Sequence, residues 1–554
     1  MDNYKKIADL LYPNVTKTAA YWEEKYKARN LDGAEVTRFA PSPTGYMHIG
    51  HFFGANLDYR IAKTTPNGVF FFRLEDTDKK REIEGSDIVA LKTLAYYGIV
   101  PDEGFTIDRE NKGNYGPYRQ SDRTEIYQTY AKQLLKEGKA FPCFCSKPEG
   151  KLEVLEKREQ QLQDDKQVEE KDPCRNLTYD EVLANINAGK SFCIRLKSNG
   201  KEGEKVKVND VVRGERELGA NCKDVVLVKD NGIPPYAFAH PVDDHLMGTT
   251  TVVRGEEWIS TWPQHVEIFN ALGFKPLKYL HTPVLCKIDE NGNKRKISKS
   301  KDPEADMRFY IQAGLPQVAV TEYLLNLMNS NFEEWREQNP ALSADEFPFD
   351  PKKVGTSSPF FDVVKLEDIS KNLISKMSAQ NVYNSVLLWA KDYNEEWYNI
   401  LKSNEEYAVK MFNIDRNIEK PRKDIVKWSD VPTLYTYFYD DLFKPESIED
   451  YALQNNYECA KELLNEYLTV YDVNDEKDVW FNKIKELGAK YGFAKEVKEY
   501  KKNKEAYIGH CGDVCTLIRV ALTGRTQTPD LFEILKLFGN DRIKARFEQF
   551  FNII

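Results

Sequence analysis

The first third of the chain carries the pattern of a strand, a helix and a second strand in close succession. EVTRFA at 35–40 alternates between apolar and polar residues as a strand does, and apolar residues at 48–63 recur with helical spacing. GVFFFRLEDTD, from Gly68, is a short apolar run bounded by turn residues, which is typical of a strand buried on both faces of a parallel sheet. Strand, helix and strand within about 40 residues predict a βαβ unit.

The alternation of strands and helices returns after an interruption. A helix is predicted at 121–138, followed at 141–222 by short strands and a charged helix, KLEVLEKREQQLQDDKQVEEK. Strand patterns resume in DVVLVKD, TTTVVRGEEW and KYLHTPVLC, with a helix at about 259–273 between the last two. KRKISKSKD, at 294–302, is expected to be a basic loop. After about residue 330 the strand signals mostly disappear and helical periodicity dominates.

These elements predict an α/β fold, namely a Rossmann-type parallel-sheet domain with an α+β insertion, followed by all-α domains. The expected parts are an N-terminal helical extension (1–33), the first half of the sheet domain (34–140), the insertion (141–222), the second half with the basic loop (223–330), and two helical regions (331–410 and 411–554).

Composition is that of a soluble globular protein. The chain has 554 residues, of which 41% are hydrophobic and 30% charged. No apolar run approaches the ~20 residues of a membrane span, and the first residues lack the apolar core of a secretory signal. We therefore expect a cytoplasmic protein without a membrane partner. Nine cysteines, an odd number in a long chain, do not indicate a disulfide framework.

The net charge of −9 argues against nucleic acid as a partner when it is taken by itself. The field that matters is local, however, and basic runs occur at 293–301, 420–427 and 495–504. Each run is compatible with a solvated surface or with a phosphate contact, and composition does not choose between them.

HIGH, at 48–51, follows the predicted first strand and a PSPTG turn. The start of a helix has unpaired N–H groups and a partial positive charge, so it is a natural site for phosphate. His48 and His51 are three residues apart, so both are expected on one face of the first turn, where they could donate to phosphate oxygens. Gly50 between them would let a base or ribose approach the backbone. Two ordinary surface histidines are the alternative.

KRKISKSK adds a second candidate phosphate site. Five cations fall within eight residues, beside the ENGN turn, with Ser298 and Ser300 between them. Such a loop suits a mobile clamp on a triphosphate, whereas a plain basic surface loop is the alternative.

HIGH and KISKS together resemble the signature motifs of class I aminoacyl-tRNA synthetases. RFAPSPTGYMHIGH and FRLEDTD, with VDDHLMGTTTVVRGEEW, KRKISKSKDPEA and ALTGRTQTPDLFEIL, narrow the resemblance to glutamyl-tRNA synthetases of the bacterial type. It extends from about residue 35 to the last residue. It implies activation of L-glutamate with ATP and Mg²⁺ to glutamyl-adenylate, and transfer to the 3′ end of tRNA(Glu) by a monomeric enzyme. The insertion would bind the acceptor end, 331–410 would contact the stem, and 411–554 would bind the anticodon.

The same resemblance assigns site residues. Catalytic roles fall to His48, His51, Lys296 and Lys299, and Gly50 and Ser298 join them in binding ATP. A pocket for glutamate needs cationic groups for two carboxylates and an anion for the ammonium. By similarity, this pocket consists of Arg38, Ala40, Ser42, Glu75, Tyr236, His240 and Arg254, with Glu75 facing the ammonium.

Two positions depart from the pattern of the family. His240, in YAFAH, stands where relatives often carry asparagine, so the contact with the side-chain carboxylate is an open point. Ser300 ends the second motif where many glutamyl enzymes have arginine.

Cys143, Cys145 and Cys174 offer three soft ligands, and the set resembles a zinc knuckle of some relatives. Asn176 and Glu170 stand where a fourth ligand would first be sought, so the pattern is broken. We therefore assign no metal from the sequence and take buried free cysteines as the default.

Several alternatives remain open. The chain could charge tRNA(Gln) as well as tRNA(Glu), could be a glutaminyl-tRNA synthetase, or could be a non-catalytic RNA-binding paralogue. The turn before HIGH disfavours the glutaminyl enzyme, and the intact motifs disfavour the paralogue. More than 200 helical residues after the sheet domain disfavour both a truncated homologue that modifies a tRNA base and a small-molecule adenylyltransferase.

Overall fold

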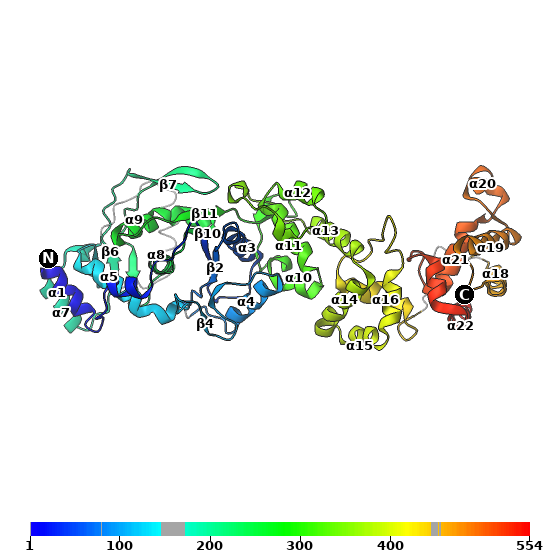
Figure 1. Cartoon of the computed structure of the whole chain (residues 1–554), viewed down its shortest axis with the longest axis horizontal. Coiled ribbons are helices and arrows are strands. Elements are labelled where there is room, and N and C mark those ends of the chain that lie inside the picture. The colour runs from blue at the N-terminus through cyan, green and yellow to red at the C-terminus, as the bar shows by residue number, and fades with distance from the viewer. Residues whose placement is uncertain (1, 79, 146–171, 445–452, 454–455, 554) are drawn as a thin grey trace. The chain divides into compact units, whose positions relative to one another are not determined.

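The computed structural model describes the chain except residues 1, 79, 146–171, 445–452, 454–455 and 554 (Figure 1). The chain folds into two compact units. The first comprises Met1–Phe309 and Thr321–Asp362, and the second comprises Tyr310–Val320 and Val363–Ile554.

Parallel strands form the centre of the first unit, as the pattern predicted. One half of the sheet has the order β1 (Val36–Phe39), β2 (Val69–Phe72), β3 (Glu103–Phe105) and β4 (Asn111–Lys112), of which the first three are parallel. In the other half, β10 (Thr251–Gly255) pairs in parallel with β11 (Lys278–Thr282). β10 runs beside β1, because the amide of Thr250 donates to the carbonyl of Val36 at 2.9 Å. All four residues of β1 are buried, as expected of a strand covered on both faces.

Helices connect and cover these strands. They are α3 (Ile49–Lys63), α4 (Ser86–Tyr96), α5 (Thr124–Lys136), α8 (Tyr236–Leu246) and α9 (Trp262–Leu272), with 3₁₀ turns η1 (Gln120–Arg123) and η3 (Glu256–Thr261). α3 follows β1 and packs against β1, β2 and β10 (Figure 1). The predicted βαβ unit is therefore present, with the start of α3 at the carboxyl end of β1, where parallel sheets bind ligands.

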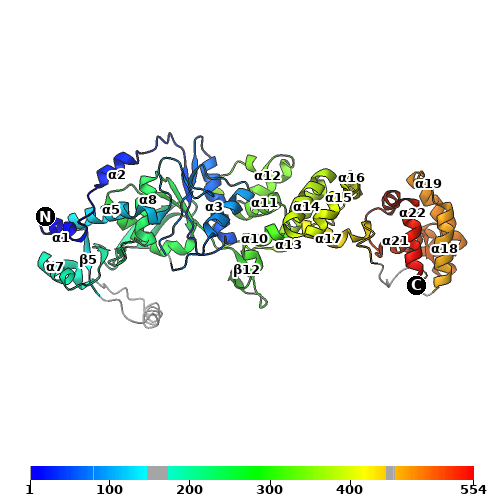
Figure 2. The same ribbon diagram turned by 90° about the horizontal axis from the view of Figure 1, so that it is seen from below.

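The two N-terminal helices pack on this unit. α1 (Asp2–Leu11) contacts α5 and α7 (Tyr179–Asn187), and both views show α1 and α7 side by side (Figure 1; Figure 2). α2 (Ala19–Lys25) buries Trp22, whose Nε1 donates to Thr129 Oγ1 at 3.2 Å. These helices share one hydrophobic core with α5, α8 and α9.

The interrupting segment contributes to two sheets. β5 (Ala140–Cys143), β6 (Cys193–Leu196) and β9 (Val226–Val228) form an antiparallel sheet, beside the turn η2 (Pro173–Asn176). β7 (Lys205–Asp210) and β8 (Gly214–Gly219) form a hairpin that joins β11 through the pair Asp210 and Tyr279. The predicted charged helix at 151–171 lies outside the described residues.

The basic loop is partly a strand, contrary to the prediction. Lys294–Lys296 form β13, which pairs antiparallel with β12 (Cys286–Ile288) around the ENGN turn. The hairpin leads into η4 (Pro303–Ala305), α10 (Met307–Ala313), α11 (Gln317–Met328), α12 (Phe332–Gln338) and the turns η5 (Ala344–Glu346) and η6 (Pro351–Lys353).

The second unit is helical, as predicted. Its helices are α13 (Val363–Lys376), α14 (Ala379–Tyr393), α15 (Glu395–Ser403), α16 (Glu405–Asn413), α17 (Val431–Leu434), α18 (Tyr457–Val470), α19 (Lys477–Lys490), α20 (Val497–Lys502), α21 (Cys511–Thr523) and α22 (Leu531–Phe551). Short turns η7 (Trp428–Asp430), η8 (Thr436–Phe438) and η9 (Lys504–Ala506) and a two-residue strand pair, β14 (Phe493–Ala494) and β15 (Gly509–His510), complete the described part.

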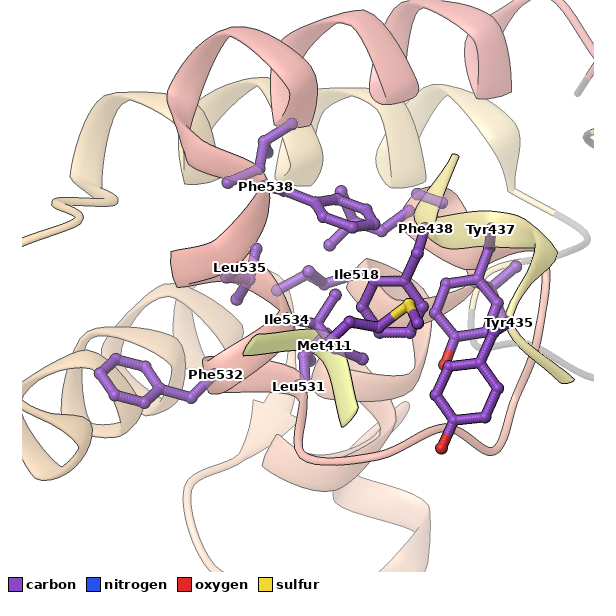
Figure 3. Packing of buried hydrophobic residues seen from close by; sticks show 14 of the residues in the cluster. Met411, Tyr435, Tyr437, Phe438, Ile518, Leu531, Phe532, Ile534, Leu535 and Phe538 are labelled. Atoms are coloured by element: carbon purple, nitrogen blue, oxygen red, sulfur yellow. The ribbon is translucent and has the colours of Figure 1, made fainter. Parts of the chain in front are cut away.

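One apolar core runs through this helical unit. Met411, Phe438 and Ile518 gather against residues of α22, including Leu535 and Phe538 (Figure 3). Gly539 interrupts α22 at φ 74°, a backbone conformation that glycine tolerates and other residues rarely adopt.

Over the described residues, the structure contains no helix with the length and apolar character needed to span a bilayer.

Candidate active site

His48 is the N-cap of α3, one residue before the helix. Its backbone is extended, at φ −79° and ψ 144°, and its Nδ1 accepts a hydrogen bond from the Gly50 amide at 2.9 Å. The prediction that both histidines lie in the first turn was therefore wrong for His48. Because Nδ1 accepts, the ring proton of neutral His48 is on Nε2. A Cβ on residue 50 would lie 3.2 Å from Nδ1, a tight contact that glycine avoids where the imidazole folds over the helix start.

Both signature histidines are disfavoured as cations. Burial lowers the pKa of His48 to about 4, with further contributions from His51, Lys299 and Lys296. Desolvation and Lys299 also lower the pKa of His51, whose ring still reaches solvent. At neutral pH these side chains are therefore uncharged N–H donors, while the lysines carry the positive charge.

The basic segment is anchored by Asp302. Arg295 donates to both carboxylate oxygens of Asp302 at 2.6 Å, and the Ser298 amide donates to Oδ2 at 2.9 Å. These contacts lower the pKa of Asp302 to about 2, the bond from Arg295 contributing most. Arg295 is thus a structural cation, whereas Lys296, at the end of β13, and Lys299 are exposed.

HIGH and the basic segment meet in space, although more than 240 residues separate them. His48 and Asp306 form an antiparallel bridge, and the Met307 amide donates to the Met47 carbonyl at 3.1 Å. Lys299 Nζ donates to the Tyr46 carbonyl. A pocket opens here, lined by Phe39, Pro41, Ser42, Pro43, Thr44, Gly45, Tyr46, Met47, His51, Leu74, Ser86, Asp87, Ala90 and Lys299. Ser42, His51 and Lys299 are thereby brought together, and Ala40 lies between two lining residues.

A buried ionic network underlies the predicted amino-acid pocket. Arg38 contacts Asp244 at 3.3 Å, and Arg73 Nη1 donates to the same carboxylate at 2.6 Å. Burial opposes ionisation of Asp244, yet Arg38 and Arg73 overcome it and hold its pKa well below the usual range. Glu75 accepts from Arg73 Nη2 at 3.0 Å, and burial raises its pKa. Arg38 is therefore fixed at the carboxyl end of β1 by a carboxylate that the sequence analysis did not identify.

His240 belongs to the same network and is fully buried. Its Nδ1 contacts Asp244 Oδ2, and its Nε2 lies 3.0 Å from the Tyr279 hydroxyl. Burial lowers its pKa to about 4, so it is neutral. With both ring nitrogens engaged inside the protein, His240 is positioned to support the pocket rather than to contact a ligand. Tyr236 stacks on it at a centroid distance of 5.2 Å.

Arg254, at the carboxyl end of β10, keeps one donor group unused. Its side chain is 8% exposed, and Nη2 is shielded from solvent without a hydrogen-bond partner among the described residues. An unpaired buried cationic donor is costly, so this nitrogen, like other arginine nitrogens buried without a partner in the described part of the chain, is available to an anionic ligand. Arg38 and Arg254 end two neighbouring strands, which places two guanidinium groups at one edge of the sheet.

Three residues of this region were missed by the sequence analysis: Arg73, Asp244 and Asp302. The motifs that contain them, FRLED, VDDHL and KSKDP, were recognised. Arg73 and Asp244 form a buried ion pair between segments far apart in the chain, whereas the buried carboxylate of Asp302 pairs with Arg295, seven residues earlier. For Arg73 and Asp244 the available signal was a charge beside apolar residues, since an unpaired charge would not be buried there. For Asp302 it was a single carboxylate at the end of a basic segment.

The three cysteines of the insertion come together with a fourth ligand, Asp172. The ligand atoms of Cys143, Cys145, Cys174 and Asp172 lie within 4.8 Å of one another, and the sulfurs of Cys145 and Cys174 are 3.6 Å apart. Tetrahedral Zn²⁺ with bonds of about 2.3 Å to sulfur needs sulfurs about 3.8 Å apart. The donor set therefore fits a structural Zn²⁺ site. Of the two positions considered from the sequence, Asn176 instead accepts from Lys197, and Glu170 lies outside the described residues.

Comparisons with known proteins agree with this arrangement. Residues 35–339 match the family model of the class I tRNA synthetase catalytic domain (E and Q), and residues 389–551 match that of an anticodon binding domain. The chain is 46% identical to a Glutamate–tRNA ligase of Acetivibrio thermocellus, over 99% of this chain and 100% of the relative. It is 43% identical to a Glutamate–tRNA ligase of Clostridium beijerinckii over the full length of both.

A solved structure is similar as well. The crystal structure of a glutamate tRNA ligase from Elizabethkingia meningosepticum in complex with its amino acid superposes with a TM-score of 0.74 at 25% identity. The match covers 94% of this chain and 99% of that one.

Proposed function

The chain belongs to the class I tRNA synthetase family of the E and Q type, and on that premise we propose that it is a glutamate–tRNA ligase. Likeness over the full length to proteins named for that activity supports the assignment. The single structural observation that carries it is the joint placement of an N–H-rich helix start, a lysine segment and two buried arginines at one edge of a parallel sheet.

We infer a reaction in two steps. An oxygen of the glutamate α-carboxylate attacks the α-phosphorus of ATP, supplied as its Mg²⁺ complex, and the bond to the bridging oxygen breaks to release pyrophosphate. A hydroxyl of the terminal ribose of tRNA then attacks the activated carbonyl, loses its proton, and displaces AMP. Neither step requires a strongly basic side chain, so positioning and charge stabilisation account for most of the rate enhancement.

Each part of the site has a role in the first step. The neutral Nε2–H of His48, with His51, is assigned to donate to phosphate oxygens as charge builds up. Gly50 and Ser298 belong to the same nucleotide site, and Lys296 and Lys299 supply positive charge to the triphosphate. Lys299, His51 and the PSPTG turn line the same pocket, which supports this assignment because one nucleotide could contact all three.

Glutamate is assigned to the arginine side of the site. The free Nη2 of Arg254 supports binding of a carboxylate rather than an amide, because a guanidinium pairs with a carboxylate through charge-assisted hydrogen bonds. Arg38 adds a second cation, Ala40 and Ser42 form the adjoining wall, and Tyr236 covers one side. Glu75 is assigned to the ammonium group, and His240 holds Asp244 and Tyr279 in place.

Aminoacylation of purified tRNA(Glu) and tRNA(Gln), each with glutamate and with glutamine, tests the proposal. Charging of tRNA(Glu) alone with glutamate identifies a discriminating enzyme, and charging of both tRNAs with glutamate identifies a non-discriminating one. Transfer of glutamine would establish the glutaminyl enzyme instead. Binding of tRNA without any charging would leave a non-catalytic RNA-binding protein and refute the proposal.

A further inference from the structure

Arg254 is held on three sides by aromatic and imidazole groups. Its Nε donates to His281 Nε2 at 2.9 Å, its Nη1 contacts His265 Nδ1 at 3.0 Å, and its guanidinium lies over the Tyr279 ring at 4.6 Å. Nη2 is left without a partner among the described residues. The direction in which this nitrogen points is therefore set by His281 and His265.

The tautomer of His281 follows from its two contacts. Arginine can only donate, so the Nε2 that faces Arg254 must be the unprotonated nitrogen. The proton is then on Nδ1, which donates to Asp210 Oδ2 at 2.7 Å. His281 and Asp210 are 0% and 2% exposed, so water does not compete for these bonds.

Asp210 comes from a different part of the chain. It ends β7, in the hairpin of the inserted segment, and its other oxygen accepts from the amides of Val212 and Arg213 at 3.0 and 2.9 Å. Oδ2 also accepts from the His281 amide at 3.0 Å. The carboxylate is thus fixed in orientation, with one oxygen on its own turn and the other on β11.

We propose that Asp210 and His281 form a positioning relay that orients Arg254 for the carboxylate of the amino-acid substrate. This proposal rests on the proposed function and deepens it, since it names two residues through which the inserted hairpin supports recognition of glutamate. Neither residue is a catalytic residue, because neither reaches the reacting atoms. Both act through the guanidinium.

Asp210→Asn is the sharpest perturbation, because it changes one atom of nearly equal size. If the Asn oxygen keeps the turn bonds to Val212 and Arg213, its NH₂ faces His281 Nδ1 and also the His281 amide, which loses its acceptor. His281 must then carry its proton on Nε2, where this proton opposes the N–H of Arg254. In the serine-protease triad, replacing the aspartate by asparagine likewise leaves the histidine in the wrong tautomer. The KM for glutamate should rise about 10-fold or more. Losses of this size are typical when a residue that only orients a binding side chain is replaced. The KM for ATP and the affinity for tRNA should stay at the wild-type values.

Two substitutions at residue 281 separate the hydrogen bond that orients Arg254 from the packing of the His281 side chain. Gln reaches the position of Nε2 and can accept from Arg254, whereas Asn reaches only the position of Nδ1 and keeps the bond to Asp210. We expect His281→Asn to raise the KM for glutamate at least as much as Asp210→Asn does, and His281→Gln to raise it less. Glu217→Gln, which removes an exposed charge from the same hairpin, should change nothing and serves as the matched control.

The assay is pyrophosphate exchange of the full-length chain with tRNA present, at varied glutamate and then at varied ATP. An unchanged KM for glutamate in Asp210→Asn would refute the relay, as would equal shifts for the two substitutions at 281 or a parallel rise in the KM for ATP. Wild-type protein without glutamate-dependent exchange would refute the proposed function instead, so the two failures are distinguishable.

Discussion

Asp302→Asn should weaken the use of ATP by releasing the basic segment. In the native structure Asp302 accepts two hydrogen bonds from Arg295 and one from the Ser298 amide, with its side chain 3% exposed. An amide in its place would present N–H groups to one of these donors. Residues 296–301 would lose their anchor without any change in the lysines themselves.

The magnitude follows from the pKa of Asp302, which falls from its ordinary value of 3.8 to about 2. That difference corresponds to about 2 kcal/mol of preference for the ionised form. If the loss falls wholly on the ordering of the segment, kcat/KM for ATP should fall by up to about 30-fold. The contribution is present above about pH 3.8 and is lost as the pH falls through about 2, so the effect should be constant across roughly pH 6.5 to 8.5.

Pyrophosphate exchange at saturating glutamate, with tRNA present, measures this effect, and Glu290→Gln is the control because it removes an exposed carboxylate from the same hairpin. A double-mutant cycle with Arg295→Met adds a stricter criterion. The double variant should be little worse than either single variant, because both remove the same contact. Unchanged kcat/KM for ATP in Asp302→Asn, or fully additive losses, would show that the ion pair does not order the segment.

Three further outcomes are expected. His48→Ala or Lys299→Ala should each lower glutamate activation by about 10²–10³-fold while tRNA binding survives, and near-normal pyrophosphate exchange would contradict their roles. Elemental analysis of protein dialysed against a weak chelator should find about one zinc per chain, and Cys145→Ser with Asp172→Asn should abolish it; equal metal content in the variant would rule out this site. Because the pKa of His240 is lowered to about 4, mainly by burial, the folded form disfavours its protonation. Its contribution to stability is present above about pH 6.5 and should shrink by about 2 kcal/mol at pH 5 in urea titrations, whereas His240→Gln should show a shallower loss.

The alternation of apolar residues determined the architecture of the sheet domain. The alternation in EVTRFA indicated a strand, the apolar run GVFFF indicated a strand covered on both faces, and the helical spacing between them indicated a crossover. PSPTG then determined where the chain turns off the first strand and where the next helix begins. These properties depend on neighbouring residues, so they are readable from one sequence.

The exact partner of each charged residue was decided only by tertiary structure. Lys294–Lys296 were predicted to be a loop because all three residues are charged. The structure shows them as a strand that pairs with Cys286–Ile288. His240 read as a ligand contact, yet its two nitrogens are taken by Asp244 and Tyr279.

Asp172 and Asp210 show the same limit at two other sites. Nothing in the local pattern distinguishes either residue from a surface carboxylate, and only folding places one beside three cysteines and the other beside His281. Local sequence sets backbone conformation and burial through short-range sterics and periodicity. Ion pairs and ligand sets depend on contacts between residues that are distant in the chain, and burial makes those contacts obligatory because an unpaired charge is too costly inside the fold.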